Sequence, residues 1–296
     1  MGKTTCSAAV AVATAAGGMR TLHITSDLAP SLSDIYGINI GDTPTSVTEN
    51  LDAMEISQER IAATWKEKFG PDFVHILSHI LDMDGMEQNG RLDLLDYIGT
   101  APALREETLL DLIVEMALQG RYGRIIWDTA PAGETLNLLY MPRLMRDHLR
   151  AGAKVYEAVD RLAGAVSGKR SLAGIMQEWV VRSEGIAAFL RERTLFFLVA
   201  NPEALVVNQV QRLMATLRQI GFTVRGMIIN RVAVADGSPF LERMEQGQKP
   251  YMDRLLALSE GLAVARVDLT LEEIRGVGPL GAIGRGLTRE LGLAGR

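Results

Sequence analysis

Short apolar runs alternate with longer amphipathic segments along this chain. Largely apolar runs occupy residues 21–25, 124–127, 195–200 and 224–229, and a weaker run occupies residues 263–267. Largely apolar runs of this length are typical of strands that are buried on both faces of a parallel sheet. Because helical patterns lie between them, the chain is predicted to be an α/β protein with a mostly parallel central sheet flanked by helices.

Two long stretches have helical periodicity, with charged residues on one face and apolar residues on the other. They cover residues 48–120 and 140–193. We interpret them as two insertions that together build a helical subdomain. The sheet domain is then formed by residues 1–47, 121–139 and 194–296.

Some features of the helical stretches leave alternatives open. Seven of the 13 methionines fall between Met54 and Met176. Methionine is common in ordinary cores and in adaptable apolar grooves, and the pattern alone does not separate the two. His75 and His79 have the spacing of two metal ligands on a helix, but no third ligand lies nearby, so a metal site is not favoured.

Polar side chains follow the ends of four predicted strands. They are Asp27, Asp128, Asn201 and Asn230. Ligands of open α/β sheets bind beyond the carboxyl ends of the strands, where such side chains converge. We therefore expect a binding site at this edge of the sheet.

The N-terminus begins with half of a phosphate-binding motif. Gly2, Lys3 and Thr4 match the end of the pattern G-x-x-x-x-G-K-[ST]; Thr5 and an alanine-rich helical segment follow directly. The upstream glycines and the strand that normally precede this pattern are not in the sequence, and a start at an internal methionine is the simplest explanation. A chain that starts at Met1 is expected to bind ATP weakly, because the missing backbone N–H groups form most of the phosphate cradle.

Residues 128–136 are the most specific segment of the chain. Asp128 ends an apolar strand, where a carboxylate can hold the water shell of a magnesium ion bound to a nucleotide. Pro131 and Gly133 follow it in a turn that could respond to a γ-phosphate. Taken alone, the segment is equally consistent with an ordinary strand-to-loop turn.

Composition excludes several classes of protein. With 296 residues and 47% hydrophobic content, the chain can bury a large core, and its net charge of −5 argues against a nucleic-acid-binding surface. The single cysteine, Cys6, excludes a disulfide framework or a cysteine-rich metal site within one chain. No apolar stretch approaches the roughly 20 residues that span a bilayer, and no signal peptide is evident, so a cytoplasmic protein is expected.

The motifs, taken in order, resemble those of the ArsA/GET family of deviant-P-loop ATPases. That family carries G-K-G-G-V-G-K-T-T, then S-T-D-P-A-H-N-L-S-D, then D-T-A-P-T-G-H-T-L, and near its C-terminus E-E-V-R-G-V. The matching segments of this chain are residues 2–5, 25–34, 128–136, 201–213, 224–232 and 272–277. The resemblance covers essentially the whole chain.

The resemblance implies a role for each matching residue. The phosphates of ATP would be bound by Gly2, Lys3, Thr4 and Thr5. Thr4 and Asp128 would hold Mg²⁺, Asp128 through water. Asp27 would be the catalytic residue that orients the attacking water, and Asn230 with Arg231 would bind the adenine side. The family's long helical insertions further imply an ATP-driven homodimer that opens and closes an apolar groove for a client helix, and the helix of a tail-anchored membrane protein is one such client.

The chain also departs from the family. Residues 28–31, including Pro30, replace the family's Pro-Ala-His-Asn, and Glu134 replaces a second histidine. No Cys-x-x-Cys pair follows the adenine-side strand, and Cys6 alone cannot bind arsenite through several thiolates. Two alternatives therefore remain beside the ATPase with a client groove: a non-hydrolysing scaffold with a degenerate nucleotide site, and an ATPase subunit of an arsenite pump.

Overall fold

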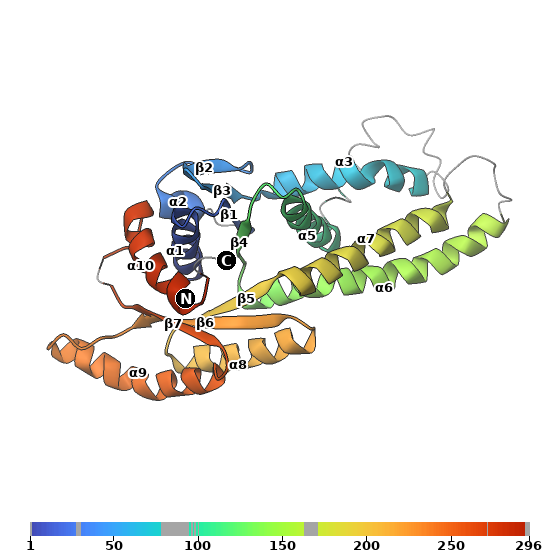
Figure 1. The fold of residues 1–296 in the computed structure, drawn as a ribbon. Coiled ribbons are helices and arrows are strands. Elements are labelled where there is room, and N and C mark those ends of the chain that lie inside the picture. The colour runs from blue at the N-terminus through green and yellow to red at the C-terminus, as the bar shows by residue number, and fades with distance from the viewer. Residues whose placement is uncertain are drawn as a thin grey trace. The chain divides into compact units, whose positions relative to one another are not determined.

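The computed structural model describes residues 2–27, 31–77, 95, 97, 99, 101–162, 171–270 and 272–293. Pro30 and His79 lie outside them. The chain divides into two compact units (Figure 1). We call Met1–Ile56, Gln119–Ala132 and Thr194–Arg296 the sheet unit, and Ser57–Leu118 and Gly133–Arg193 the helical unit.

The sheet unit contains mostly parallel strands, as predicted. One sheet has the order β2-β3-β1-β4, in which β1 pairs in parallel with β3 and β4. The other has the order β5-β6-β7 and is entirely parallel. The α/β class is confirmed, and the described strands are divided between two sheets rather than joined in one. Their bounds are β1 (Thr21–Thr25), β2 (Thr45–Thr48), β3 (Leu51–Glu55), β4 (Arg124–Asp128), β5 (Leu195–Ala200), β6 (Thr223–Val232) and β7 (Ala263–Asp268).

Strand β3 lies where the sequence pattern had indicated the start of a helical insertion, and β2 ends at its first residue, Thr48. β2 and β3 lie side by side. They form an antiparallel hairpin, and β3 also pairs with β1. The charged residues that favoured a helix have tertiary partners instead. Asp52 accepts a hydrogen bond from the Tyr122 hydroxyl at 2.7 Å, and Glu55 accepts one from the backbone N–H of Leu32 at 2.8 Å. Residues 48–56 therefore belong to the sheet unit.

Helices α1 (Lys3–Ala16) and α10 (Val277–Glu290) cross closely and share one core with strands of both sheets. Small residues permit this approach: a Cβ atom on Gly284 would lie only 2.0 Å from the carbonyl oxygen of Ala9. The alanine-rich sequence of α1 thus reflects close packing. This close packing also fixes the start of α1, where the phosphate motif lies.

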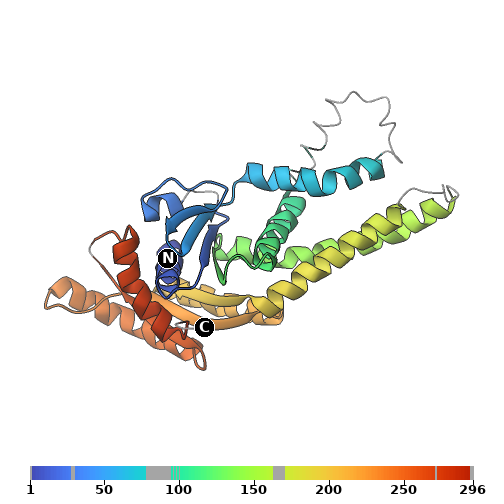
Figure 2. The ribbon, with the colours of Figure 1, turned by 45° about the horizontal axis from the view of Figure 1, so that its top comes forward.

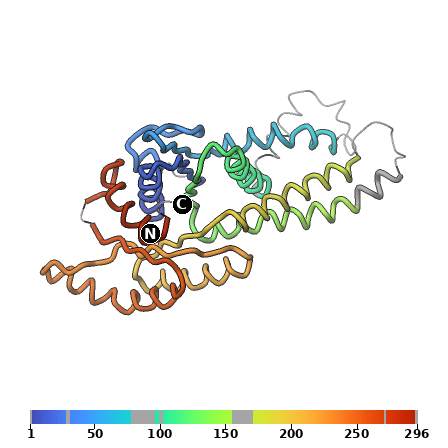
Figure 3. Tube along the Cα trace, viewed as in Figure 1, coloured from blue at the N-terminus to red at the C-terminus, as the bar shows by residue number. Residues whose placement is uncertain are grey.

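The remaining helices of the sheet unit complete its layers. α8 (Ala204–Gln219) and α9 (Pro239–Leu258) lie on one side of the sheet β5-β6-β7, and α1 and α10 lie on the other (Figure 3). The short helix α2 (Leu32–Tyr36) follows β1 and packs against α1. This arrangement of helices around parallel strands is the one that buries strands on both faces.

The helical unit consists of α3 (Gln58–Leu77), α5 (Pro102–Leu118), α6 (Ala132–Leu162) and α7 (Leu172–Arg193). α6 and α7 run side by side in both ribbon views (Figure 1 and Figure 2), joined by a core that includes Leu149, Ile175 and Val180. Within the described residues, no helix combines the length and the apolar content needed to cross a bilayer.

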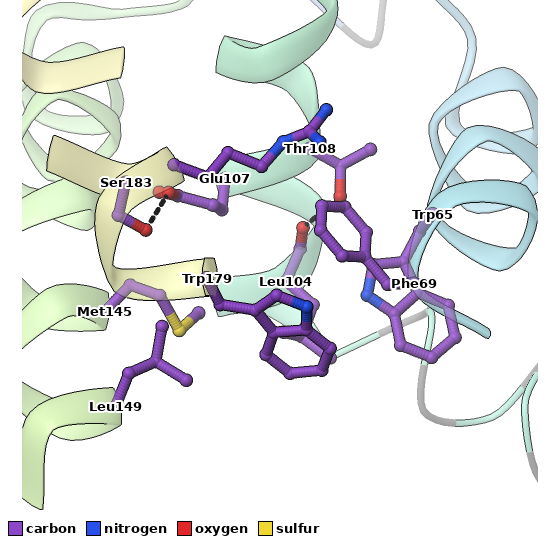
Figure 4. A pocket seen from close by; sticks show the side chains of 10 residues that line it. Trp65, Phe69, Leu104, Glu107, Thr108, Met145, Leu149, Trp179 and Ser183 are labelled. Carbon is purple, nitrogen blue, oxygen red and sulfur yellow. Dashed lines mark hydrogen bonds between the residues drawn. The ribbon is translucent and has the colours of Figure 1, made fainter. Parts of the chain in front are cut away.

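Helix α5 carries two buried carboxyl groups of the helical unit, those of Asp111 and Glu107. Asp111 binds Arg182 through two hydrogen bonds of 2.5 and 2.7 Å and Lys68 through one of 2.8 Å. One turn earlier, Glu107 is buried and accepts a 2.5 Å hydrogen bond from Ser183 (Figure 4). Glu107 and Ser183 line a small cavity of about 30 Å³ beside Trp179.

Burial raises the pKa of Glu107 to about 7, and the neighbouring charge of Asp111 adds to the rise. When the pKa of a carboxyl group is raised in the folded state, its ionisation destabilises the fold. The free energy of unfolding therefore falls as the pH rises from about 4.5 to 7. We expect Glu107→Gln to raise the free energy of unfolding by about 2 to 3 kcal/mol at pH 8 and to have little effect at pH 4.5.

Urea unfolding of a Trp127→Phe background tests this, because the other tryptophans, Trp65 and Trp179, both lie in the helical unit. Glu192→Gln, an exposed change on α7, is the matched control and should show no such pH dependence. An equal effect of Glu107→Gln at both pH values would contradict the raised pKa.

Candidate functional site

A cleft of about 450 Å³ opens in the sheet unit, which is in the size range of small-molecule sites. The start of α1, the start of α2, the end of β6 and the segment after β7 contribute to its walls. The lining residues are Gly2, Thr4, Thr5, Ser31, Asp34, Ile35, Asn230, Arg231, Asp268, Leu269, Thr270, Glu272, Glu273, Ile274 and Arg275.

The start of α1 supplies the floor of this cleft. Gly2 adopts the left-handed conformation, with φ of 80°, immediately before the helix. A Cβ atom at this position would lie 2.2 Å from the side-chain amide nitrogen of Asn230, so the close approach of the two residues requires glycine. The first N–H groups of α1 have no partner within the helix, and the helix dipole adds positive potential, as an anion site requires.

Strand β4 places its terminal carboxylate against the same helix. The Thr4 hydroxyl donates a 2.6 Å hydrogen bond to Asp128, although the two residues are 124 positions apart in the sequence. Lys3 donates a 2.9 Å hydrogen bond to the carbonyl oxygen of Ala130, just beyond the strand. The structure therefore brings Lys3, Thr4 and Asp128 together.

Burial raises the pKa of Asp128, and the nearby charge of Asp27 raises it further. The hydrogen bond from Thr4 and the charge of Lys3 act in the opposite direction. Asp27 follows β1, the neighbour of β4, and its backbone N–H donates to the Thr25 hydroxyl at 3.2 Å. Two carboxylates thus influence each other beside the start of α1, an arrangement that favours binding of a cation.

The two residues expected on the adenine side lie at the end of β6. Asn230 is buried next to Gly2, and Arg231 is the single non-glycine residue with positive φ, 59°, among the described residues. Gln248 of α9 holds this bend: it accepts from the backbone N–H of Ala233 at 2.8 Å and donates to the carbonyl of Arg231 at 2.9 Å. A held, strained residue in a cleft is a frequent feature of functional sites.

Of the four predicted strand-end residues, Asn230 lines the cleft, whereas Asp27, Asp128 and Asn201 do not. Asn201, which follows β5, donates a 3.2 Å hydrogen bond to Glu203 and does not line the cleft. Cys6 is buried in α1, and burial raises the pKa of its thiol to about 12, so it stays a neutral core residue.

Sequence reasoning missed a polar residue inside strand β1. His23 is fully buried, with Nδ1 2.7 Å from the Tyr36 hydroxyl and Nε2 3.0 Å from the Ser7 hydroxyl. Burial lowers the pKa of His23 to about 3. A histidine within an otherwise apolar strand was the signal available, but its partners on α1 and α2 could not be identified from spacing.

These features define a class of protein. Parallel strands flanked by helices, with a Gly-Lys-Thr-Thr helix start facing a strand-end aspartate, constitute the fold of a P-loop NTPase.

Comparison with known proteins specifies the family. A family model described as anion-transporting ATPase matches residues 1–289, and the chain belongs to this family, the ArsA-type ATPases. It is 27% identical to "ATPase ARSA2" of Chlamydomonas reinhardtii, over 93% of this chain and 78% of that protein. It is also 27% identical to "ATPase ASNA1 homolog 1" of Paramecium tetraurelia (94% and 86%) and to "ATPase ASNA1 homolog" of Dictyostelium discoideum (94% and 83%).

Proposed function

We propose that this protein binds and hydrolyses ATP in the cleft of the sheet unit. The contact between Thr4 and Asp128, at the start of a helix that opens on the cleft, is the observation that carries the proposal. It joins the phosphate motif to the strand-end carboxylate in the way that nucleotide hydrolysis requires. Membership of an ATPase family supports the same reaction.

The lining residues suggest how ATP lies. Backbone N–H groups at the start of α1, where Gly2, Thr4 and Thr5 line the cleft, would bind the phosphates. Lys3 does not line the cleft, and its ammonium group would turn from the Ala130 carbonyl to the phosphates. Asn230 and Arg231 would bind the adenine side, because an amide can both donate to and accept from a base edge.

The site also fits Mg²⁺. The Thr4 hydroxyl and the Asp128 carboxylate are hard oxygen ligands, and a site with one or two carboxylates completed by phosphates and water suits this ion. When bound, Mg²⁺ neutralises charge on the phosphates. Asp128 would hold it through water, and Asp27 would orient the water that attacks the γ-phosphate, since positioning dominates this reaction.

We further propose that ATP drives the opening and closing of a homodimer, and that the helical unit offers an apolar surface to a client helix. Exposed apolar side chains on its helices support this part: Leu118, Leu144 and Val181 are 68%, 61% and 59% exposed. An arsenite-pump role is less well supported, because Cys6 is the single cysteine of the chain and is buried.

Replacing Asp27 by asparagine is the test of the catalytic assignment. We expect Mg²⁺-dependent ATP hydrolysis by the full-length protein to fall about 100-fold, because the neutral amide is a weaker acceptor for the attacking water than the charged carboxylate. Affinity for MgADP should change less than about 3-fold, since the phosphates bind elsewhere.

Asp253→Asn makes the same chemical change on the exposed face of α9 and should leave both quantities unaltered. If the Asp27 variant hydrolyses ATP as fast as the parent, the role of Asp27 is wrong. If the parent binds MgADP but does not hydrolyse ATP, the protein is the non-hydrolysing scaffold.

A further inference from the structure

A buried chain of hydrogen bonds joins the start of α1 to α2. Tyr36 on α2 contacts Nδ1 of His23 at 2.7 Å, and Nε2 of His23 contacts the Ser7 hydroxyl of α1 at 3.0 Å. The Ser7 hydroxyl donates in turn to the carbonyl of Thr4 at 3.0 Å. Three elements of the sheet unit are thus connected through one imidazole ring.

The hydrogen bonds have one consistent direction. Because the Ser7 hydroxyl gives its proton to the Thr4 carbonyl, its oxygen accepts from Nε2–H of His23. Nδ1 then carries no proton and accepts from the Tyr36 hydroxyl. The lowered pKa of His23 keeps the ring neutral, as this direction requires.

α2 is a wall of the nucleotide cleft. Asp34 and Ile35 of this helix line it opposite Thr4, and the carbonyl of Ile35 accepts a 2.8 Å hydrogen bond from the N–H of Gly276 in the segment after β7. At its start, Glu55 accepts from the N–H groups of Leu32 and Ser33 at 2.8 Å each. The helix has only five residues, so such side-chain contacts, rather than its own hydrogen bonds, fix its position.

We propose that His23 is a positioning residue of the nucleotide site, which holds the cleft wall α2 at a fixed distance from the phosphate-binding start of α1. This rests on the proposed function, because the wall matters only if the cleft binds a nucleotide. The ring does not touch the ligand; it acts through Ser7 on the Thr4 backbone and through Tyr36 on α2.

A double-mutant cycle tests the connection, since Ser7 and Tyr36 each bond to His23 and are linked through it. Ser7→Ala and Tyr36→Phe remove single hydroxyl groups and should preserve the fold. We expect each to weaken MgADP binding to the full-length protein about 5-fold, and the double variant also about 5-fold rather than about 25-fold, because either change breaks the same chain of hydrogen bonds. Calorimetric titration measures the three dissociation constants.

Tyr122→Phe is the control, because that hydroxyl donates to Asp52 and Tyr122 does not line the cleft. Its MgADP affinity should equal that of the parent. If the effects of the Ser7 and Tyr36 changes are independent in a parent that binds MgADP, the role of His23 is overturned and the proposed function is not. A parent that binds no nucleotide would overturn the proposed function and this proposal with it.

His23 itself allows two more measurements. His23→Gln retains an acceptor and a donor and should bind MgADP within about 2-fold of the parent, whereas His23→Leu should lose about 5-fold or more. The chain has four histidines, so the ring ¹⁵N signals of His23 can be assigned by difference from the glutamine variant. A neutral ring protonated at Nε2 supports the proposed chain, and protonation at Nδ1 would overturn it.

Discussion

Replacing Lys3 by methionine is expected to reduce Mg²⁺-dependent ATP hydrolysis about 1000-fold, since a positive charge that faces transferring phosphate is worth that much in comparable sites. Lys3 begins α1 and donates its side-chain hydrogen bond to the Ala130 carbonyl rather than to a carboxylate. Its charge is therefore available to a phosphate. Methionine preserves the length and the helix propensity, so the change removes mainly the charge.

The measurement compares steady-state hydrolysis and MgADP affinity of the variant and the parent in the full-length protein. Lys249→Met, an exposed change on α9, is the matched control and should behave as the parent. The melting temperature of the Lys3 variant should stay within a few degrees, because a partly exposed hydrogen bond of this kind contributes about 1 kcal/mol. Hydrolysis within 10-fold of the parent would exclude Lys3 from the phosphate site.

The strands were predictable because parallel strands buried on both faces require continuous apolar runs. The run at residues 195–200 coincides with β5, and the run at residues 21–25 coincides with β1. Strand β6 extends beyond its run to Val232, since its last residues form the bend at Arg231 held by Gln248. The fold class followed from this pattern without knowledge of contacts.

The hairpin of β2 and β3 was not predictable in the same way. Its strands are short, and β3 carries Asp52 and Glu55, whose charges suggested a helix face. These charges are accommodated by Tyr122 and by the N–H groups of α2, contacts that arise only in the folded chain. The division of the strands between two sheets is likewise a property of pairing, which apolar runs do not encode.

The candidate site could be predicted only as far as its motifs extend. Lys3, Thr4 and Asp128 were singled out from local patterns. The structure joins Thr4 to Asp128 and Lys3 to the nearby Ala130, and their roles in ATP binding stay predictions. His23 and Gln248 belong to no motif, and each acts on residues distant in the sequence. Tertiary hydrogen bonds of this kind determine how a site is held, and spacing does not reveal them.

Replacing Gly284 by alanine is expected to lower the free energy of unfolding of the sheet unit by about 4 kcal/mol, beyond the usual range of about 1 to 3 for overpacking. The added Cβ atom would lie 2.0 Å from the carbonyl oxygen of Ala9 and 2.9 Å from the Cβ atom of Ala13. The obstacle is mostly backbone of α1, which cannot rotate away as a side chain can. The two helices must therefore move apart.

Gly286→Ala provides a control on the same helix, because a Cβ atom there meets nothing within 4 Å. It should stabilise the protein by up to about 1 kcal/mol through helix propensity. Urea unfolding measures both variants, and hydrogen exchange of peptides from α1 and α10 localises the change. Since α1 carries Lys3 and Thr4 at its start, the Gly284 variant should also bind MgADP more weakly than the Gly286 variant. Equal stability of the two variants would show that the crossing of α1 and α10 is looser than the structure indicates.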